Sequence, residues 1–303
     1  MNSPLVGTVS ARIGLWQRVR SYLALCKLRI VELIVFTAVV GMLLAVPEWP
    51  PFGRVLLATL GIALAAASAA TINHVIDRHI DNRMRRTCYR PLPRGALTEH
   101  QALAFAAVLG VVSMAVLTLG VNLLSAVLTF GGLIGYAVVY TAFLKHITPQ
   151  NIVLGGAAGA IPPVIGWTAM TGHIDPMALA LFLIIFIWTP PHFWALAIHR
   201  RDDYAKAGVP MLPVTHGIRL TRLHILLYTV LLVAISVMPW ALGASGWVYL
   251  AAALLLGAGF LYHAVRLWRG HDERAPMATF RYSILYLSLL FAALLVDHYL
   301  LLI

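Results

Sequence analysis

Long apolar runs alternate with short polar segments along almost the whole chain. Each run is close to the ~20 residues that an α-helix needs to cross the hydrocarbon core of a bilayer. The polar segments between the runs carry nearly all of the charged side chains. We therefore predict an all-α membrane protein with nine spans. The spans are expected near residues 29–46, 55–76, 102–121, 123–144, 152–170, 177–198, 223–242, 247–265 and 282–302.

The predicted spans leave little room for any other domain. Residues 1–28 form a polar N-terminal segment, and residues 29–303 form a single nine-helix membrane domain. The third and fourth spans must be joined by a very tight turn at residues 120–122. The two longest loops on one side, 77–101 and 199–222, follow the second and the sixth spans.

The composition supports a membrane protein and excludes an ordinary soluble domain. Of the 303 residues, 61% are hydrophobic and only 11% are charged, whereas soluble domains carry about a quarter charged residues. The net charge of +11 could indicate a nucleic-acid binder. We expect no nucleic-acid partner, however, because the cations lie in short loops between apolar runs.

The lysines and arginines predict the orientation of the spans. Of the 22 such residues, all except Arg54 fall in the N-terminal segment or in even-numbered loops. Because basic loops stay on the cytoplasmic side, the N-terminus is expected in the cytoplasm and the C-terminus in the periplasm. The chain then belongs in a bacterial inner membrane, with the lipid bilayer as its solvent.

An acidic strip lies where the second predicted span ends. Asn73, Asp77 and Asp81 are spaced by four residues, which places them on one face of a helix. Oxygen donors arranged in this way suit a hard divalent cation such as Mg²⁺. The alternative is a helix end whose carboxylates pair with neighbouring arginines. Like charges four residues apart disfavour an isolated helix, so either arrangement must compensate them.

A basic run follows the acidic strip directly. Arg86, Arg90 and Arg94 again recur every four residues, although Pro91 and Pro93 disfavour one continuous helix through them. Arginine forms forked, charge-assisted hydrogen bonds to phosphate oxygens. Any one of these arginines is also explained as a topological anchor. The acidic strip followed by the basic run is what indicates a phosphate ligand.

The sixth loop has a similar mixture of charges. Asp202 and Asp203 are adjacent, and Lys206 lies one helical turn further on. The similar loops are separated by four spans, which suggests two related halves that bring both loops together. Two acidic sites with neighbouring cations indicate a metal-bridged polyphosphate held between them.

Several of these segments resemble the UbiA superfamily of intramembrane prenyltransferases. Asn73, Asp77 and Asp81 match its first motif, and the second acidic motif follows four spans later. Within the superfamily, the chain is most similar to the branch that farnesylates protohaem IX. The stretches that carry the resemblance are residues 81–92, 149–156, 159–167, 188–197 and 202–213.

The resemblance implies a UbiA-type helical bundle and a Mg²⁺-dependent transferase. Farnesyl diphosphate and haem b would be its substrates, and haem O, formed with addition of water, its product. It assigns catalytic roles to the residues of the two acidic motifs, and Mg²⁺ ligation to Asp77, Asp81 and Asp203. The second motif departs from the usual pattern, because His199 stands four residues before Asp203 and Asp202 must supply the other carboxylate.

Further roles follow from the same resemblance. Lys27, just before the first span, would bind the diphosphate together with Arg86, Arg90, Arg94 and Lys206, although a simple anchor explains Lys27 equally well. His192 and His199 are candidates for haem contacts, as an iron ligand or a propionate partner. A packing role explains His192 equally well. Haem A synthase or terminal oxidase assembly factors would receive the product.

Two other functions fit part of this pattern. One is a prenyltransferase of the same superfamily that acts on an aromatic acid or a quinone precursor. The other is a secondary transporter, whose coupling carboxylates would lie near the bilayer midplane. The carboxylates here lie in loops with arginines, which favours phosphate chemistry over ion transport.

Overall fold

A computed structural model describes residues 14–82 and 87–300, except for the side chain of His146. Every regular element in this part of the chain is helical. The helices, in chain order, are α1 (Leu15–Leu25), α2 (Leu28–Leu44), α3 (Phe52–Ile76), α4 (Arg78–Asp81), α5 (Glu99–Gly120), α6 (Leu123–Ile134), the π-helix η1 (Gly135–Leu144), α7 (Lys145–Ile147), α8 (Asn151–Ala160), α9 (Pro162–Thr171), α10 (Pro176–His199), α11 (Arg201–Lys206), α12 (Leu212–Thr215), α13 (Gly217–Ser236), α14 (Met238–Ala241), α15 (Trp247–Arg269) and α16 (Ala275–Leu300).

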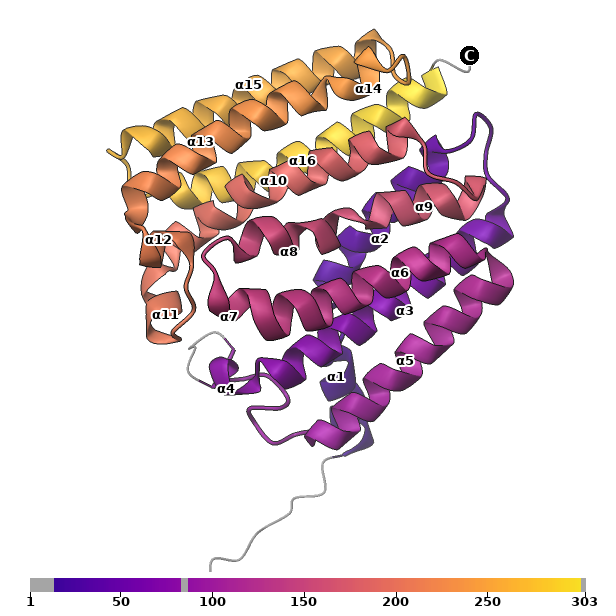
Figure 1. The fold of residues 1–303 in the computed structure, drawn as a ribbon, viewed down its shortest axis with the longest axis vertical. Coiled ribbons are helices and arrows are strands. Elements are labelled where there is room, and N and C mark those ends of the chain that lie inside the picture. The colour runs from indigo at the N-terminus through magenta and orange to yellow at the C-terminus, as the bar shows by residue number, and fades with distance from the viewer. Residues whose placement is uncertain (1–13, 83–86, 301–303) are drawn as a thin grey trace, which may run out of the picture.

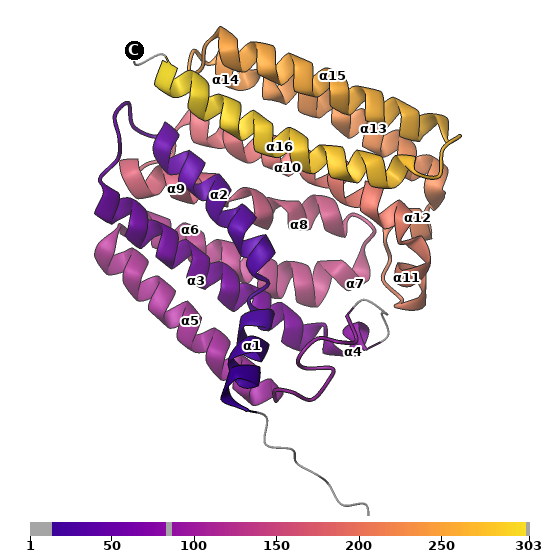
Figure 2. The same cartoon turned by 180° about the vertical axis from the view of Figure 1, so that it is seen from behind.

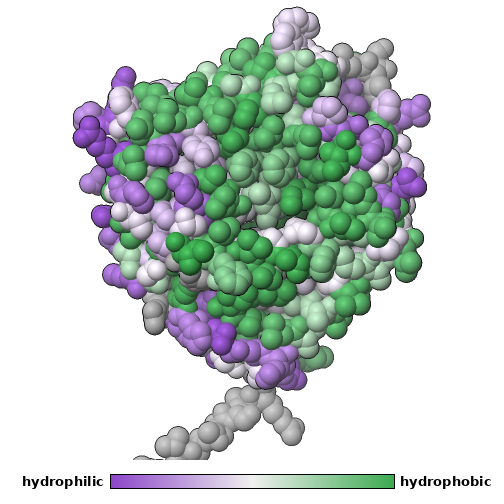
Figure 3. Space-filling model, in the orientation of Figure 1, coloured by the Kyte–Doolittle hydropathy of each residue, from purple (hydrophilic) through white to green (hydrophobic). Residues whose placement is uncertain are grey.

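The long helices make this a multi-pass membrane protein. In the described part of the chain, eight helical segments are long and apolar enough to cross a bilayer, and they correspond to the second to ninth predicted spans. The first predicted span is α2, which has 17 residues. The surface agrees with this arrangement, because Figure 3 shows a broad hydrophobic region across the middle of the molecule with hydrophilic residues gathered toward its edges.

The tight turn predicted between the third and fourth spans is confirmed. Helix α5 ends at Gly120 and α6 begins at Leu123. The Asn122 side chain caps α6 by accepting a hydrogen bond from the Ser125 N–H at 2.8 Å. Its amide group also donates to the Thr168 carbonyl in α9 at 2.8 Å. The turn is therefore fixed both to the helix that it starts and to a neighbouring span.

Several boundaries differ from the sequence prediction, among them the start of the ninth span, which lies at Ala275 instead of residue 282. The fifth span is broken at Ile161, because Pro162 begins a new helix and proline has no N–H to continue the helical hydrogen bonds. The seventh span starts at Gly217, six residues before the predicted 223. The N-terminal segment contains the helix α1, which ends at a sharp turn at Lys27.

Close helix packing brings α2 against the broken span. Gly166 in α9 faces the Ala38 carbonyl, and Gly41 in α2 faces the Pro163 carbonyl, with no room for a Cβ atom at either glycine. Helix α10 crosses the core, and Leu181, Ile184 and Trp194 on it are almost completely buried. The bundle therefore holds α2, α9 and α10 in fixed positions around its centre.

The connecting segments gather at two ends of the bundle. Figures 1 and 2 show α4, α7, α11 and α12 at one end, and α14 with the C-terminal end of α16 at the other. At this second end, Asp297 in α16 is buried and accepts hydrogen bonds from the Gly246 and Tyr249 N–H groups at 2.5 and 3.0 Å. Asp297 therefore caps α15 from a different helix and joins the last two spans.

Candidate functional site

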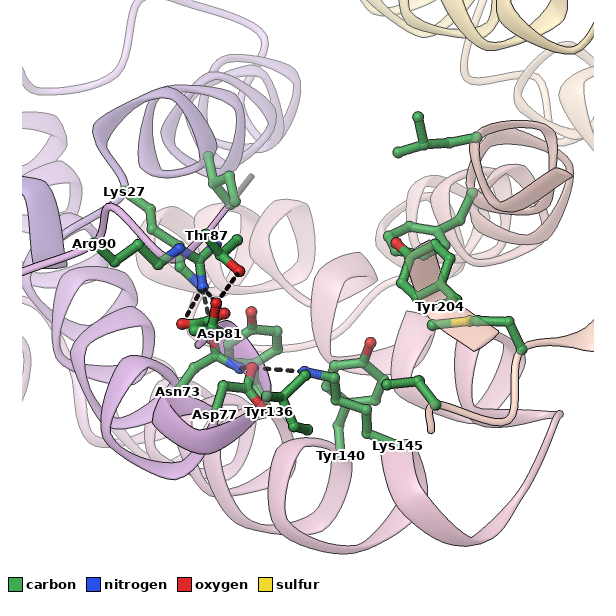
Figure 4. A pocket seen from close by; sticks show the side chains of 16 residues that line it. Lys27, Asn73, Asp77, Asp81, Thr87, Arg90, Tyr136, Tyr140, Lys145 and Tyr204 are labelled. Carbon is green, nitrogen blue, oxygen red and sulfur yellow. Dashed lines mark hydrogen bonds and ion pairs between the residues drawn. The ribbon is translucent and has the colours of Figure 1, made fainter. Parts of the chain in front are cut away.

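A pocket of about 210 Å³ opens at the end of the bundle that carries α4, α7 and α11 (Figure 4). One part of its wall is charged, and the rest is aromatic or aliphatic. The lining residues are Lys27, Ile30, Asn73, Asp77, Ile80, Asp81, Thr87, Arg90, Tyr136, Tyr140, Lys145, Phe193, Leu196, Tyr204, Val209 and Met211. Residues from both of the predicted long loops therefore reach the same pocket.

The acidic strip forms the floor of the charged part. Helix α3 ends at Ile76, and a short turn leads into α4, with the Asp81 N–H donating to the Asp77 carbonyl at 2.8 Å. The chain thus stays close to helical, and Asn73, Asp77 and Asp81 all face the pocket as their spacing predicts. Their exposed fractions are only 3–4%, so these polar groups depend on protein partners.

Asp77 pairs with a residue that lies far away in the sequence. One of its carboxylate oxygens, Oδ2, lies 2.6 Å from the Lys145 amine and accepts a hydrogen bond from the Asn73 amide at 2.9 Å. The Asn73 amide also donates to the Thr141 hydroxyl at 3.1 Å, and its carbonyl oxygen accepts from the Lys27 amine. The other carboxylate oxygen, Asp77 Oδ1, is buried and has no partner among the described residues.

Asp81 is held by the basic segment that follows α4. The Arg90 Nη1 group donates to both carboxylate oxygens of Asp81, at 2.8 and 2.7 Å. The Thr87 hydroxyl donates to the Asp81 backbone carbonyl at 3.1 Å. These contacts fold the loop back over the end of α3, which places the guanidinium group of Arg90 at the edge of the pocket.

Lys27 occupies an unusual backbone position above the strip. Its φ and ψ angles are 50° and 53°, and it is the only described non-glycine residue with a positive φ. Such strained positions cluster at functional sites. Burial lowers the pKa of the Lys27 amine most strongly, the nearby Arg90 and Lys145 also lower it, and Asp77 and Asp81 oppose the shift, so that the pKa lies at about 7. Near neutral pH the amine can therefore be charged or neutral.

An aromatic wall stands beside the charged residues. Tyr136 and Tyr140 belong to the π-helix η1, and their rings stack at 5.7 Å with an angle of 26°. Gly155 in α8 leaves the space that the Tyr140 ring fills. π-Helical turns are rare and often lie at functional sites. Here the wider turn is stabilised by the Thr141 hydroxyl, which donates to the Tyr136 carbonyl at 2.8 Å.

The sixth loop reaches the pocket with residues other than those expected. Tyr204 lies across the pocket from Asp81 in Figure 4, and Val209 and Met211 line the same side. Asp202 and Lys206 are exposed, Asp203 is half-buried, and none of the three lines the pocket. A second metal site on this loop therefore stays a prediction.

The other predicted residues lie apart from the charged cluster. Arg94 and His199 are exposed and do not line the pocket, and Arg86 lies outside the described residues. His192 is half-buried between α10 and α16 and is stacked between two aromatic rings, Trp188 at 4.1 Å and Phe280 at 4.6 Å. The roles predicted for these four residues stay predictions.

One ring nitrogen of His192 is held and the other is not. His192 Nδ1 lies 2.6 Å from the Ser283 hydroxyl. Nε2 has no hydrogen-bond partner among the described residues, and this atom is not fully buried. Ser283 and the two stacked rings therefore fix the orientation of the imidazole ring. The geometry suits a histidine that is held in place to meet a ligand, and it suits a packing residue equally well.

Several residues that line the pocket were not predicted from the sequence. Lys145 was counted only as a topological charge, although it is the only lysine or arginine in its loop. Tyr136 and Tyr140 are four residues apart within a span, which is a detectable signal for a polar aromatic face. Thr87 and Tyr204 carried no separate signal, because their place in the pocket depends on how the loops fold.

The charged part of the pocket is chemically suited to a divalent cation. Among the described residues, no three His, Cys, Asp or Glu side chains are grouped as a metal site. Mg²⁺ needs only one or two protein carboxylates when phosphate and water oxygens complete its shell. Asp77 and Asp81 provide such carboxylates, and the unpartnered Oδ1 of Asp77 is an available donor atom. The residues present therefore fit Mg²⁺.

Taken together, three cations and two carboxylates lie beside an aromatic and aliphatic wall at one end of a membrane-spanning bundle. This is a membrane protein with a pocket that is chemically suited to an amphipathic polyanion. The chain belongs to the UbiA prenyltransferase family, whose model matches residues 34–294.

Curated relatives are similar over nearly the whole chain. The protoheme IX farnesyltransferase of Methylococcus capsulatus is 61% identical over 283 residues, covering 93% of this chain and 95% of the relative. The protoheme IX farnesyltransferase of Leptothrix cholodnii is 57% identical over 304 residues, covering 99% of this chain and 98% of the relative.

Solved structures share the fold at lower identity. A digeranylgeranylglyceryl phosphate synthase superposes with a TM-score of 0.79 at 19% identity, covering 93% of this chain and 99% of that protein. A UbiA homologue from Archaeoglobus fulgidus, bound to DMAPP and Mg²⁺, superposes with a TM-score of 0.62 at 17% identity, covering 90% of this chain and 99% of that protein. These similarities establish the bundle architecture.

Proposed function

We propose that the protein transfers the farnesyl group of farnesyl diphosphate to a vinyl group of haem b. The products are haem O, which carries a hydroxyethylfarnesyl group, and diphosphate. The observation that carries this proposal is the pocket itself, where Asp77, Asp81, Lys27, Arg90 and Lys145 lie beside the aromatic wall. The names of relatives at 54–61% identity support the same substrates.

The charged residues would bind the diphosphate. Lys27, Arg90 and Lys145 are already directed into the pocket, where they contact Asn73, Asp81 and Asp77. Asp77 and Asp81 would hold Mg²⁺, which supplies positive charge to the leaving diphosphate when bound. The cations would then exchange part of their carboxylate contacts for phosphate oxygens. Such interactions accelerate the reaction because they strengthen as charge develops on the leaving group.

The aromatic wall would receive the reactive end of the farnesyl chain. The allylic C–O bond breaks, and the diphosphate leaves with the bonding electrons. The haem vinyl group then supplies its π electrons to the allylic carbon, and water adds to the carbocation beside the porphyrin and loses a proton. Tyr136 and Tyr140 can stabilise the allylic cation through their ring faces, while Phe193 and Leu196 keep premature water away.

His192 is the proposed contact for haem iron, because Ser283 fixes its ring through Nδ1 and Nε2 has no partner among the described residues. We also propose substrate contacts for His199, Arg86 and Arg94. The role of the sixth-loop charges can be separated from topology. Moving one cation, as Lys206→Ala with Ala205→Lys, keeps the charge of the loop and should weaken farnesyl diphosphate binding only if Lys206 binds phosphate.

We place the protein in a bacterial inner membrane with a cytoplasmic N-terminus and a periplasmic C-terminus. The lysine and arginine distribution supports this orientation. A reporter that is active only outside the cytoplasm should give a signal when fused after Ile303 and none when inserted after Gly95. The reverse result would exclude a cytoplasmic active site. Haem A synthase or terminal oxidase assembly factors are the proposed recipients of the product.

The decisive experiment is a reconstitution assay. Purified protein in lipid nanodiscs would be incubated with haem b, labelled farnesyl diphosphate and Mg²⁺, and the products separated by chromatography and mass spectrometry. Haem b should gain one farnesyl group and one water, and chelation of Mg²⁺ should stop the reaction. Transfer to an aromatic acid or quinone precursor, with none to haem b, would replace haem as the acceptor.

A further inference from the structure

A second pocket adjoins the first on the side of the N-terminal helix. It has a volume of about 480 Å³ and lies where α1 turns into α2. Its lining residues are Arg20, Leu23, Ala24, Lys27, Leu28, Arg29, Ile30 and Arg90. Lys27, Ile30 and Arg90 also line the first pocket. The two pockets are therefore neighbours that share three residues, and we call the second one the N-terminal pocket.

The charges in the N-terminal pocket all have the same sign. Four of its eight lining residues are cationic, and none is acidic. Lys27 and Arg90 contact Asn73 and Asp81 in the first pocket. Arg20 and Arg29 are exposed and form no ion pair with any side chain that the structure describes. These two guanidinium groups are therefore available to an anionic ligand.

The remaining walls are apolar and accessible. Leu23, Leu28 and Ile30 are each about half exposed, at 48%, 48% and 51%. The left-handed backbone of Lys27 turns α1 away from the axis of α2 and so shapes the hollow between them. A matching ligand needs a broad apolar body with anionic groups along one edge. Phosphate alone would leave the apolar walls unused.

We propose that the N-terminal pocket binds the propionate edge of the haem acceptor, with Arg20 and Arg29 as the carboxylate partners. This inference rests on the proposed function. The porphyrin carries its two propionates on the edge opposite its vinyl groups. Holding the propionates in this pocket turns the vinyl edge toward the neighbouring pocket, where the allylic carbon of farnesyl diphosphate would lie. Lys27 and Arg90, which line both pockets, would then lie between the haem propionates and the diphosphate.

The assignment can be tested by removing the charge from either the protein or the ligand. The variants are Arg20→Gln, Arg29→Gln and the double variant, with Arg18→Gln as a matched control. Arg18 is an exposed cation on α1, the helix that carries Arg20, and Arg18 does not line the pocket. The ligands are haem b and its dimethyl ester, whose propionates carry no charge. Binding is measured by absorbance titration in nanodiscs, and transfer is measured by product formation.

Each single variant should weaken haem b binding about three- to five-fold, which is the size expected of an exposed ion pair. The double variant should weaken it about ten-fold or more, while the KM for farnesyl diphosphate keeps the wild-type value. Binding of the dimethyl ester should be the same in every variant, because the ester has no carboxylate to lose.

Three results would overturn the inference. Equal losses for haem b and for its ester would mean that the arginines act on the protein structure. Unchanged haem b binding in the double variant would make them topological anchors. An effect seen only in nanodiscs with anionic phospholipid would identify a headgroup site instead. If the wild-type protein does not farnesylate haem b at all, the proposed function fails. If it farnesylates haem b and the dimethyl ester equally well, only the propionate assignment fails.

Discussion

The pair formed by Asp77 and Lys145 gives the most informative test of the site. The Lys145 amine lies 2.6 Å from Asp77 Oδ2, and the two side chains are only 14% and 5% exposed. Lys145→Met removes the charge and keeps an apolar side chain of similar length. Within the part of the chain that the structure describes, the Asp77 carboxylate would then retain only the Asn73 amide as a partner. We expect the variant to be less stable than the wild type and to bind farnesyl diphosphate poorly.

The expected loss follows from the geometry. At a distance of 2.6 Å and an effective dielectric constant of about 20, the attraction is roughly 6 kcal/mol before desolvation is subtracted. Removing one member of a buried pair costs about 3–5 kcal/mol. Since Lys145 borders a cavity, the lower end applies, and we expect a loss of about 3 kcal/mol. Adding Asp77→Asn should recover about 2 kcal/mol of stability, because no buried charge is then left alone.

The experiment is a double-mutant cycle on purified protein in detergent. The variants are Lys145→Met, Asp77→Asn and the combination, with free energies of unfolding taken from denaturant titrations. A matched control adds Gln150→Lys to Lys145→Met, since Gln150 is exposed in the same loop and the new lysine restores the positive charge for topology. The double variant should be stable but inactive. If the two substitutions add within about 0.5 kcal/mol, the pair is not coupled and the reasoning is wrong.

Three further predictions use other parts of the molecule. Asp81→Ala should abolish farnesyl transfer in protein that still folds and inserts, as measured by turnover at ordinary Mg²⁺ concentration. Lys27, whose pKa is lowered to about 7, must take up a proton to bind diphosphate above that pH; the affinity should then fall by up to about ten-fold per pH unit, and Lys27→Arg should remove this dependence. Asp297→Ala leaves the part-buried Gly246 N–H and the buried Tyr249 N–H without an acceptor, which should cost about 2–4 kcal/mol and lower the thermal midpoint, while Asp297→Asn should cost less.

Each of these tests has an outcome that contradicts it. Near-normal turnover of Asp81→Ala would remove this carboxylate from the metal site. A pH dependence that is equally steep in Lys27→Arg would assign the titration to the diphosphate or to another group. An Asp297→Ala variant with wild-type stability would show that water replaces the lost acceptor at the start of α15.

The helical architecture was predictable because the bilayer restricts the choice of structure. Without water in the hydrocarbon core, each apolar run must satisfy its own backbone hydrogen bonds. The positions of eight long helical segments agree with the predicted spans for this reason. The tight turn at residues 120–122 could be predicted because the third and fourth predicted spans are almost adjacent in the sequence, and no tertiary information was needed. The break at Ile161 was harder to predict from the sequence, because a proline can also stand in the first turn of a continuing helical segment.

The acidic half of the site was also predictable, since it is local. Asn73, Asp77 and Asp81 repeat every four residues, and a helical chain must then place them on one side. Arg90 follows within the same loop. Their convergence on one pocket required only that α3, α4 and the next turn fold as neighbours in sequence.

Tertiary structure alone decided which distant residues complete the site. Lys145 reaches Asp77 only because the span that ends with η1 packs beside α3. The sixth loop presents Tyr204 to the pocket instead of Asp202 or Asp203, because the short helix α11 buries Tyr204 and leaves Asp202 exposed. The sequence shows which residues share one face of a helix, but which faces of separate helices contact each other depends on how their side chains pack. The acidic strip was therefore determined locally, and its cationic and aromatic partners were determined by the packing of the bundle.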